Sequence, residues 1–171
     1  MEQRASCRVK RLWTPWRMKF ILSDKSRECI FCQKSAEDRD QDNYILYRGQ
    51  HAFIMLNAYP YNNGHLLIAP YAHEPSTENL DDATLAEMML LVNRGLAALR
   101  KAMAPHGFNV GINLGKVAGA GIADHVHIHV VPRWQGDNNF MPVVGDTRLI
   151  PECLEDTYKR LIDAGIADTR S

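Results

Sequence analysis

Three histidines alternate with aliphatic residues in the run His125-Val126-His127-Ile128-His129. Successive side chains of a β-strand point to opposite faces, so the three imidazoles share one face and the aliphatic side chains share the other. Because a protein core takes up the aliphatic face, the histidine face looks onto a cleft or onto whatever covers it. Neutral imidazoles act as acids, bases or nucleophiles near neutral pH, which makes this strand the first candidate for chemistry. Incidental histidines on a half-exposed strand are the alternative.

Metal binding is a second use for such a run, because a His-x-His pair can hold one ion with two imidazoles. The outer histidines, His125 and His129, lie about 13 Å apart along a strand, so all three do not suit one ion and at least one imidazole stays available. A neutral imidazole is a good nucleophile toward phosphorus, and the phosphoramidate that it forms is easily broken by a second nucleophile. The glycine-rich run 115–121 directly upstream could present backbone N–H groups to phosphate oxygens, although such a run is often a plain connection.

Cys29-Ile30-Phe31-Cys32 places two cysteines at the spacing of one metal knuckle. In a reducing compartment such a pair is metal-binding or redox-active rather than part of a disulfide framework. The other two cysteines, Cys7 and Cys153, have no local partner pattern. A pair of buried or redox-active thiols is the alternative to a metal site.

The histidine strand needs a sheet around it, and several segments have the composition and turn boundaries of strands. These segments are Tyr44–Tyr47, Ala52–Leu56, His65–Ala69, Phe108–Leu114 and His125–Val131. Apolar residues from Leu85 to Met103 recur at steps of three and four and predict a long helix. We expect it to start at Ser76 or Thr77 and to end before Pro105, and a C-terminal helix to cover Glu152–Ala164. An antiparallel sheet of about five strands with one long central helix and a C-terminal helix is an α+β fold.

A length of 171 residues and a hydrophobic content of 46% suit one sizeable core. Twenty basic and twenty acidic residues balance, so no overall field favours nucleic acid or an anionic membrane as a partner. No apolar run approaches the roughly 18 residues of a membrane span, and the polar N-terminus is not a secretory signal, so we expect a cytoplasmic protein. Residues 1–43 are expected to form an irregular arm, with a short helix at Arg17–Leu22, packed on a catalytic domain of residues 44–171.

The histidine run continues to Val131 and follows the pattern His-φ-His-φ-His-φ-φ, in which φ is an apolar residue. With this motif the chain resembles the HIT superfamily of nucleotide hydrolases and transferases, and a HIT-like fold is implied. Leu56-Asn57 and Gly64–Pro70 are similar to the family's nucleotide-binding strand pair, and the likeness covers about residues 44–140. Two further stretches are similar to the bacterial branch that includes diadenosine tetraphosphate phosphorylases, namely Arg11–Met18 and Pro132–Phe140.

The resemblance implies a double displacement on a nucleotide. His127 attacks the α-phosphorus, and water or phosphate then releases the nucleotide from the histidine. His129 stabilises phosphate oxygens or serves the leaving group, and Asn57 meets the ribose. The other substrate-binding positions that the resemblance implies are His65, Asn113, Gly119 and Gly121. Family members are commonly homodimers whose sheets join, so we expect a homodimer without an organic cofactor.

A structural zinc site is implied as well, because HIT proteins with a Cys-x-x-Cys arm resemble this arrangement and bind zinc there. The ligands would be Cys29, Cys32, His73 and His125. Four protein donors leave no open position on a tetrahedral ion. This assignment leaves His127 and His129 for chemistry.

One position departs from the family's pattern. Many members have Gln followed by Ser or Thr in the loop before the histidines, where this chain has Gly121-Ile122. A hydroxyl that could assist the leaving group is therefore absent, and the substrate preference of better-known hydrolases does not carry over. We expect a nucleotidyl hydrolase or transferase for dinucleoside polyphosphates, either a phosphorylase or a hydrolase. A nucleoside phosphoramidate hydrolase, a nucleotide-binding regulator with little turnover and a metal-dependent hydrolase are the alternatives.

Overall fold

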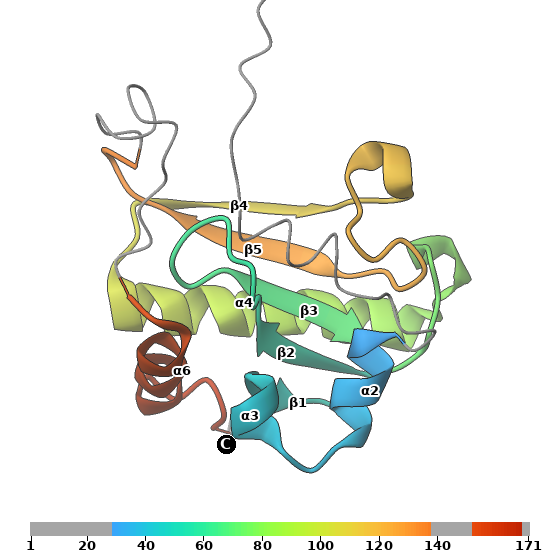
Figure 1. The fold of residues 1–171 in the computed structure, drawn as a ribbon, viewed down its shortest axis with the longest axis horizontal. Coiled ribbons are helices and arrows are strands. Elements are labelled where there is room, and N and C mark those ends of the chain that lie inside the picture. Colours follow the sequence, from blue (N-terminus) through green and yellow to red (C-terminus); the bar gives the residue numbers. More distant parts are fainter. Residues whose placement is uncertain (1–28, 138–151, 169–171) are drawn as a thin grey trace, which may run out of the picture.

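The computed structural model describes residues 29–137 and 152–168, and its centre is a five-stranded sheet (Figure 1). All neighbouring strands are antiparallel, in the order β1-β2-β3-β5-β4. The strands are β1 (Ile45–Arg48), β2 (Ala52–Leu56), β3 (Leu66–Pro70), β4 (Gly107–Ile112) and β5 (Ile128–Arg133). The predicted α+β class with an antiparallel sheet is confirmed. The helix predicted at Arg17–Leu22 lies outside the described residues.

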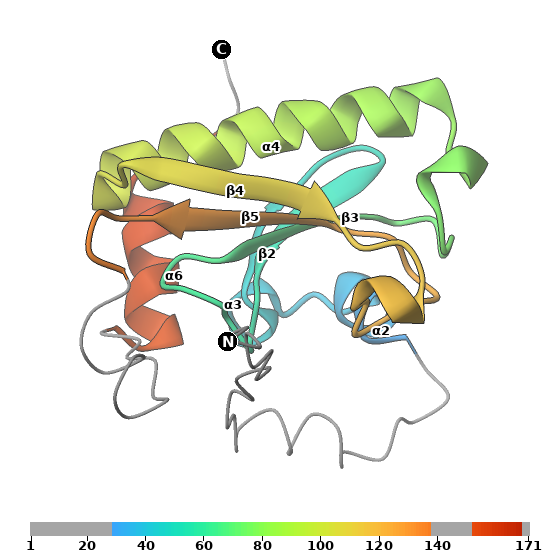
Figure 2. The same ribbon diagram turned by 90° about the horizontal axis from the view of Figure 1, so that it is seen from above.

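Helices cover both faces of the sheet (Figure 2). They are α2 (Ile30–Ala36), α3 (Asp40–Asn43), α4 (Asp82–Met103) and α6 (Leu154–Asp163), with 3₁₀ turns at η1 (Thr77–Asn79) and η2 (Lys116–Ala118). The long helix α4 lies along one face, and α2 lies on the opposite side. The C-terminal helix α6 contacts α4 and β1, while α3 contacts β1. In the part of the chain that the structure describes, no helix has the length and apolar character of a membrane span.

Buried side chains form one apolar cluster on each face of the sheet. The cluster under α4 includes Ile54, Leu56, Leu66, Ile68, Leu91, Leu99, Ile128 and Val130. The cluster on the α2 side consists of Phe31, Ile45, Phe53, Met55, Leu67 and Ala69. Side chains alternate along a strand, so Ile128 and Val130 point toward α4 and His129 points toward the α2 side. The face that carries the histidines is therefore the face that α2 covers.

Helix α4 contains the predicted apolar repeat, although Met89 of that repeat is exposed. The helix begins at Asp82, later than the predicted start at Ser76 or Thr77. Asp81 is its N-cap, and the side-chain carboxylate accepts a hydrogen bond of 2.7 Å from the backbone N–H of Thr84. This bond satisfies one of the N–H groups that have no partner within the helix. Aspartate caps a helix as well as serine or threonine does, so Ser76, Thr77 and Asp81 were all possible N-caps by residue type.

The prediction of an irregular arm is wrong for the described residues before β1, because they form α2 and α3. The side chain of Phe31 is fully buried and holds the first turn of α2 against the sheet. At α3, Arg48 of β1 forms an ion pair of 2.7 Å with Asp40. The boundary between an arm and a catalytic domain at residues 43 and 44 stays a prediction.

Glu87 of α4 holds the turn between β1 and β2 against the helix. Its carboxylate accepts hydrogen bonds from three consecutive backbone N–H groups, those of Gln50, His51 and Ala52. Glu87→Ala should lower the free energy of unfolding by about 3 kcal/mol, because these donors lose a charged acceptor. Urea unfolding followed by circular dichroism measures the loss. Asn93→Ala, on an exposed position of the same helix, should change it by less than about 0.5 kcal/mol, and equal effects of the two variants would contradict this role.

Candidate active site and metal cluster

His127 is buried, with 6% of its surface exposed, immediately before β5. Its Nδ1 lies 2.9 Å from the backbone carbonyl oxygen of His125, so Nδ1 carries a proton and donates it. In a neutral imidazole the other nitrogen, Nε2, then holds a free lone pair. The structure therefore presents His127 in the tautomer that a nucleophile needs at Nε2.

The strand that was predicted to begin at His125 begins instead at Ile128. The backbone N–H of Val126 donates to the carbonyl of Glu74 at 2.7 Å. Glu74 lies in the segment after β3, outside the sheet. His125 and His127 therefore lie on an irregular segment that is tied to this loop, and His129 is the member of the run that lies within the sheet.

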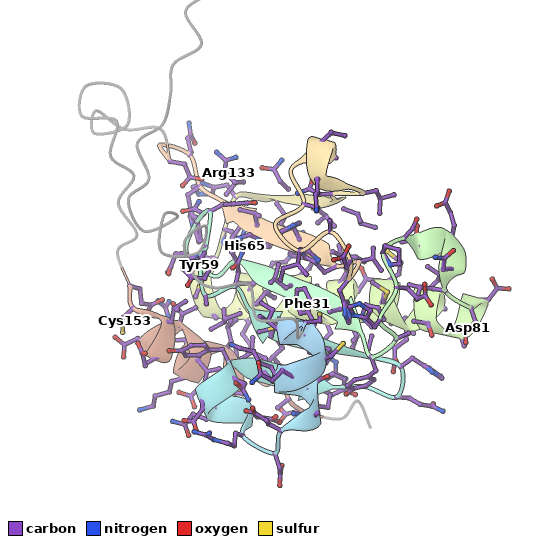
Figure 3. The ribbon with its side chains drawn as sticks, turned by 45° about the vertical axis from the view of Figure 1, so that its right-hand side comes forward. Phe31, Tyr59, His65, Asp81, Arg133 and Cys153 are labelled. Atoms are coloured by element: carbon purple, nitrogen blue, oxygen red, sulfur yellow. The ribbon has the colours of Figure 1, made fainter. Side chains whose placement is uncertain are left out.

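His65, which Figure 3 labels, forms a hydrogen-bonded pair with His129. Nδ1 of His65 accepts from the backbone N–H of Tyr61 at 3.0 Å and lies 3.2 Å from Nδ2 of Asn57. The proton of His65 is therefore on Nε2, which donates to Nδ1 of His129 at 2.9 Å. The proton of a neutral His129 is then on its own Nε2, where it can be donated to a phosphate oxygen.

Burial keeps these imidazoles neutral. Burial first, and the neighbouring histidines second, lower the pKa of His65 to about 3 and the pKa of His129 to about 4. Burial also lowers the pKa of His127, although the hydrogen bond to the carbonyl of His125 acts in the opposite direction. The lone pair of His127 is therefore available at neutral pH.

The same pKa shifts make the stability of the fold depend on pH. His65 and His129 titrate near 6.5 in an unfolded chain but at about 3 and about 4 in the folded protein. Between roughly pH 6.5 and 4 the unfolded chain binds protons that the folded protein does not, so the free energy of unfolding falls as the pH falls. Urea unfolding should show a shallower pH dependence for His65→Asn than for the native protein. Equal slopes for the native protein and His65→Asn would refute the assignment.

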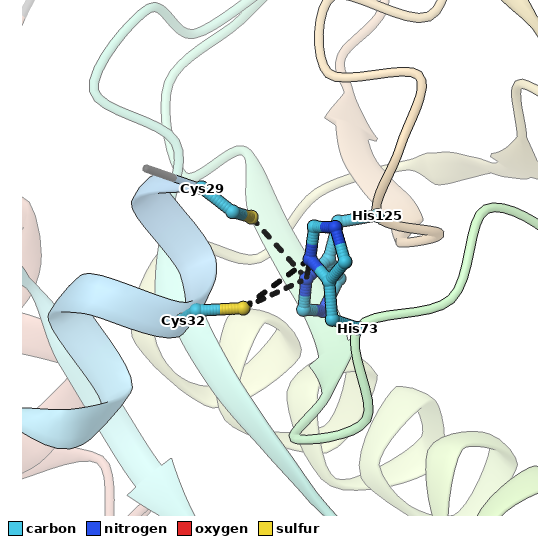
Figure 4. Close-up of side chains that lie close together, drawn as sticks. All are labelled: Cys29, Cys32, His73 and His125. Atoms are coloured by element: carbon cyan, nitrogen blue, oxygen red, sulfur yellow. Dashed lines mark hydrogen bonds between the residues drawn. The ribbon is translucent and has the colours of Figure 1, made fainter. Parts of the chain in front are cut away.

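Four potential metal ligands converge between α2 and the loops that follow β3 and precede β5 (Figure 4). One donor atom each from Cys29, Cys32, His73 and His125 lies within 4.8 Å of the others. Nδ1 of His125 is 3.3 Å from Sγ of Cys29, 3.6 Å from Sγ of Cys32 and 3.3 Å from Nδ1 of His73. Sγ of Cys32 is also 3.3 Å from Nδ1 of His73. The structure thus brings together the residues that were predicted as metal ligands.

This donor set fits a tetrahedral zinc ion. Bonds of about 2.3 Å to sulfur and about 2.0–2.1 Å to nitrogen place tetrahedral donors about 3.3–3.8 Å apart. The four separations given above, 3.3–3.6 Å, lie in this range. Nε2 of His125 donates to the carbonyl of Pro70 at 2.9 Å, which leaves the lone pair of Nδ1 directed into the cluster. Burial, and then Cys29, raise the pKa of the Cys32 thiol, an effect that a bound cation would oppose.

The remaining predicted substrate positions are spread around the histidines. Asn57 follows β2, where its Oδ1 accepts from the backbone N–H of Tyr59 at 2.9 Å and its amide nitrogen contacts His65. Asn113 is half-buried just after β4, and Gly119 and Gly121 are exposed in the loop that leads to β5. Among the described residues, no hydrogen bond joins these last three to the histidines. Their role toward a substrate stays a prediction.

Two aromatic side chains outside the predicted set pack on the histidines. The ring of Phe31 lies 5.0 Å from that of His125 and 4.9 Å from that of His127, between centroids. The ring of Tyr61 packs in the same way on His65 and His129, at 4.7 Å and 5.7 Å between centroids. Phe31 lies inside the Cys-x-x-Cys motif and Tyr61 in the turn before β3. A phenylalanine or a tyrosine in a sequence does not reveal whether it packs on a catalytic histidine or elsewhere in the core. The one indication in the sequence was that both residues lie close to a recognised motif.

A pocket of about 230 Å³ is lined by the β2–β3 loop and by the start of α6. Asn57 and His65 belong to its lining, together with Glu152. His127 and His129 do not line it. The pocket therefore adjoins Asn57 and His65 but not the two histidines that are the catalytic candidates.

Comparisons with known proteins agree with this arrangement. The HIT domain family matches residues 38–136. A protein of Mycobacterium tuberculosis named AP-4-A phosphorylase is 38% identical over 161 residues, which cover 90% of this chain and 83% of that protein.

Two solved structures share the fold. A Zn-bound histidine triad family protein from Mycobacterium smegmatis gives a TM-score of 0.64 with 28% identity and covers 80% of this chain and 92% of its own. A hypothetical histidine triad nucleotide-binding protein from Sulfolobus tokodaii gives a TM-score of 0.62 with 26% identity over 80% of this chain and 91% of its own. The matched domain, the relative that covers nearly the whole chain and the shared fold show that this chain belongs to the HIT family.

Proposed function

We propose that this chain is a nucleotidyl hydrolase or transferase that cleaves phosphoanhydride bonds through a covalent intermediate on His127. The observation that carries the proposal is the pair of opposite tautomers. His127 presents a lone pair on Nε2, whereas His129 presents a proton on Nε2. The two rings are 4.8 Å apart between centroids. A nucleophile beside a hydrogen-bond donor is what a displacement at phosphorus requires.

The first step forms a bond from Nε2 of His127 to the α-phosphorus and breaks the bond from that phosphorus to the bridging oxygen. The leaving oxygen takes the electron pair, and Nε2 of His129 donates a hydrogen bond to it as negative charge develops. The carbonyl of His125 accepts from Nδ1 and so stabilises the positive charge that His127 gains. In the second step phosphate or water attacks the same phosphorus, the bond to Nε2 breaks, and its electron pair returns to His127. The proton that an attacking water loses passes to solvent.

A dinucleoside polyphosphate is the substrate class that we propose, because a relative with 38% identity over 90% of this chain is named AP-4-A phosphorylase. With diadenosine tetraphosphate and phosphate, a phosphorylase produces ADP and ATP, whereas a hydrolase produces AMP and ATP. Chromatography of the products with and without added phosphate separates the two. Tight nucleotide binding without either product set would favour a regulator, and faster cleavage of adenosine phosphoramidate would favour a phosphoramidate hydrolase.

A structural zinc ion is the occupant that we propose for the cluster of Cys29, Cys32, His73 and His125. Support comes from the donor spacing, from the hydrogen bond between His125 and Pro70, and from the Zn-bound relative. Because four protein donors leave no open position, the ion would supply a cross-link and no activated water. It would tie α2 to the segments on either side of the histidine face.

A homodimer is the assembly that we propose, with β4 as the contact, because β4 is an edge strand of the sheet. Its side chains Val110 and Ile112 are 46% and 39% exposed, and an edge strand with exposed apolar residues can pair with a second chain. Replacing both with lysine should convert a dimer into a monomer, which sedimentation velocity detects as a halved mass. Val117→Lys adds the same charge at an exposed valine of the β4–β5 loop and should leave the dimer intact. A native protein that sediments as a monomer would disprove the proposal.

A further inference from the structure

Phe31 brings the cysteine pair and the proposed nucleophile into contact. It lies between Cys29 and Cys32 in the sequence, on the first turn of α2, and it is fully buried. Its ring centroid is 5.0 Å from the ring of His125 and 4.9 Å from the ring of His127. One side chain therefore packs both on a residue of the metal cluster and on the residue that would attack phosphorus.

Backbone hydrogen bonds connect the same two sites a second time. The carbonyl of His125, whose side chain belongs to the cluster, accepts the Nδ1 proton of His127 at 2.9 Å. The backbone N–H of Val126 donates to the carbonyl of Glu74 at 2.7 Å, and Glu74 directly follows His73 of the cluster. The segment that carries His127 is thus attached to both histidines of the cluster.

Helix α2 is held at both ends: Arg48 of β1 donates to the carbonyls of Ser35 and Glu37 at its C-terminal end, and other contacts hold its first turn. It has 7 residues, and its N-cap residue, Cys29, makes no capping hydrogen bond with its side chain. So short a helix is marginal without tertiary contacts. Phe31 is the buried residue of α2, and its ring together with the two thiols forms the attachment of the first turn to the rest of the fold.

We propose that Phe31 is a positioning residue that transmits the state of the metal cluster to His127. With an ion bound, the two thiolates hold the start of α2, and Phe31 keeps the imidazole of His127 buried in one orientation. When the ion is removed, the first turn of α2 moves away together with Phe31, and His127 becomes accessible and loses its single orientation. The catalytic consequence rests on the proposed function, whereas the coupling itself requires no substrate.

Chemical modification of His127 in the full-length protein, without nucleotide, tests the coupling. Diethyl pyrocarbonate reacts with neutral imidazole, and peptide mass spectrometry measures its rate at residue 127 in zinc-loaded and chelator-treated protein. His127 in the zinc-loaded protein should react at about one tenth of its rate in the chelator-treated protein, or more slowly still. The reason is that a buried ring reacts only when the local structure opens. Zinc-loaded Phe31→Ala should keep its zinc but react as fast as the chelator-treated native protein.

Two further variants separate positioning from general packing. Phe31→Leu keeps an apolar side chain against the histidines and should restore most of the protection. Phe53→Leu removes a buried ring that packs on Phe31 at 6.5 Å and should keep the native difference between zinc-loaded and chelated protein. The coupling is overturned if Phe31→Ala leaves His127 as protected as in the native protein, or if Phe53→Leu exposes it equally.

Kinetics on diadenosine tetraphosphate provide a second readout. Zinc-loaded Phe31→Ala should lower kcat with KM unchanged, because the nucleophile is misplaced while the substrate contacts remain. A rise in KM with an unchanged kcat would assign Phe31 to substrate binding and overturn the positioning role. If the native protein cleaves no dinucleotide, the proposed function fails, and the modification rates still decide whether the cluster and His127 are coupled.

Discussion

Replacement of His127 by alanine should reduce the turnover of diadenosine tetraphosphate by about 10³-fold or more, because the variant has no nucleophile to form the covalent intermediate. His129→Ala should have a smaller effect, about 10²–10³-fold, because it removes one hydrogen-bond donor to the leaving oxygen. Initial rates over a range of substrate concentrations measure both effects. The larger effect is expected for His127→Ala because the tautomers make His127 the nucleophile and His129 a hydrogen-bond donor.

His106→Ala is the control for histidine loss at an exposed position and should retain native turnover. His127 is buried against Phe31, so its replacement could disturb the fold. Circular dichroism and zinc content therefore check that each variant is folded. A His127→Ala variant that is folded and keeps more than about a tenth of the native kcat would show that another group attacks phosphorus.

Removal of the proposed zinc ion should cause the largest loss of stability. A ligand that binds the folded state at a thousandfold excess over its Kd contributes about 4 kcal/mol. For a chain of this size each kcal/mol corresponds to about 2–4 °C in Tm, so chelation should lower the Tm by about 8–16 °C. Differential scanning calorimetry with and without a chelator measures the shift, and elemental analysis should find one zinc per chain.

Single cysteine variants show whether the loss arises at the cluster. Cys32→Ser should lower the Tm of the untreated protein and abolish the effect of the chelator, because Cys32 contacts both histidines of the cluster. Cys153→Ser changes an exposed cysteine at the start of α6, outside the cluster, and should leave the effect intact. A chelator effect that survives in Cys32→Ser, or a native protein that purifies without metal under zinc-replete conditions, would contradict the zinc assignment.

Sequence patterns predict the strands and the long helix because those elements follow local rules. The segment Ala52–Leu56 is both predicted and observed as β2, since turn residues mark its two ends and β-rich residues fill it. The apolar residues from Leu85 to Met103 repeat along most of the 22-residue helix α4, so they identify the helix even though its start was predicted too early. Helix α2 has one buried residue, Phe31, and a single anchor produces no periodic pattern.

The candidate site is predictable as a set of residues but not as a set of tautomers. Cys29 and His125 are 96 positions apart, so no local spacing brings them together, and the resemblance to the HIT superfamily supplied the pairing. The tautomer of His129 depends on His65, which is 64 positions away. The direction of the His125 lone pair depends on the carbonyl of Pro70. Such partners become visible when the fold has placed β3 beside β5.

Capture of the covalent intermediate tests the central claim most directly. Native protein is mixed rapidly with diadenosine tetraphosphate that is radiolabelled at the α-phosphorus, quenched in alkali to preserve a phosphoramidate, digested and analysed by mass spectrometry. We predict that the label is attached to the peptide that contains His127 in the native protein and in His106→Ala, and that it is absent from His127→Ala. A label on another residue, or product formation without any labelled peptide, would contradict the assignment of His127 as the nucleophile.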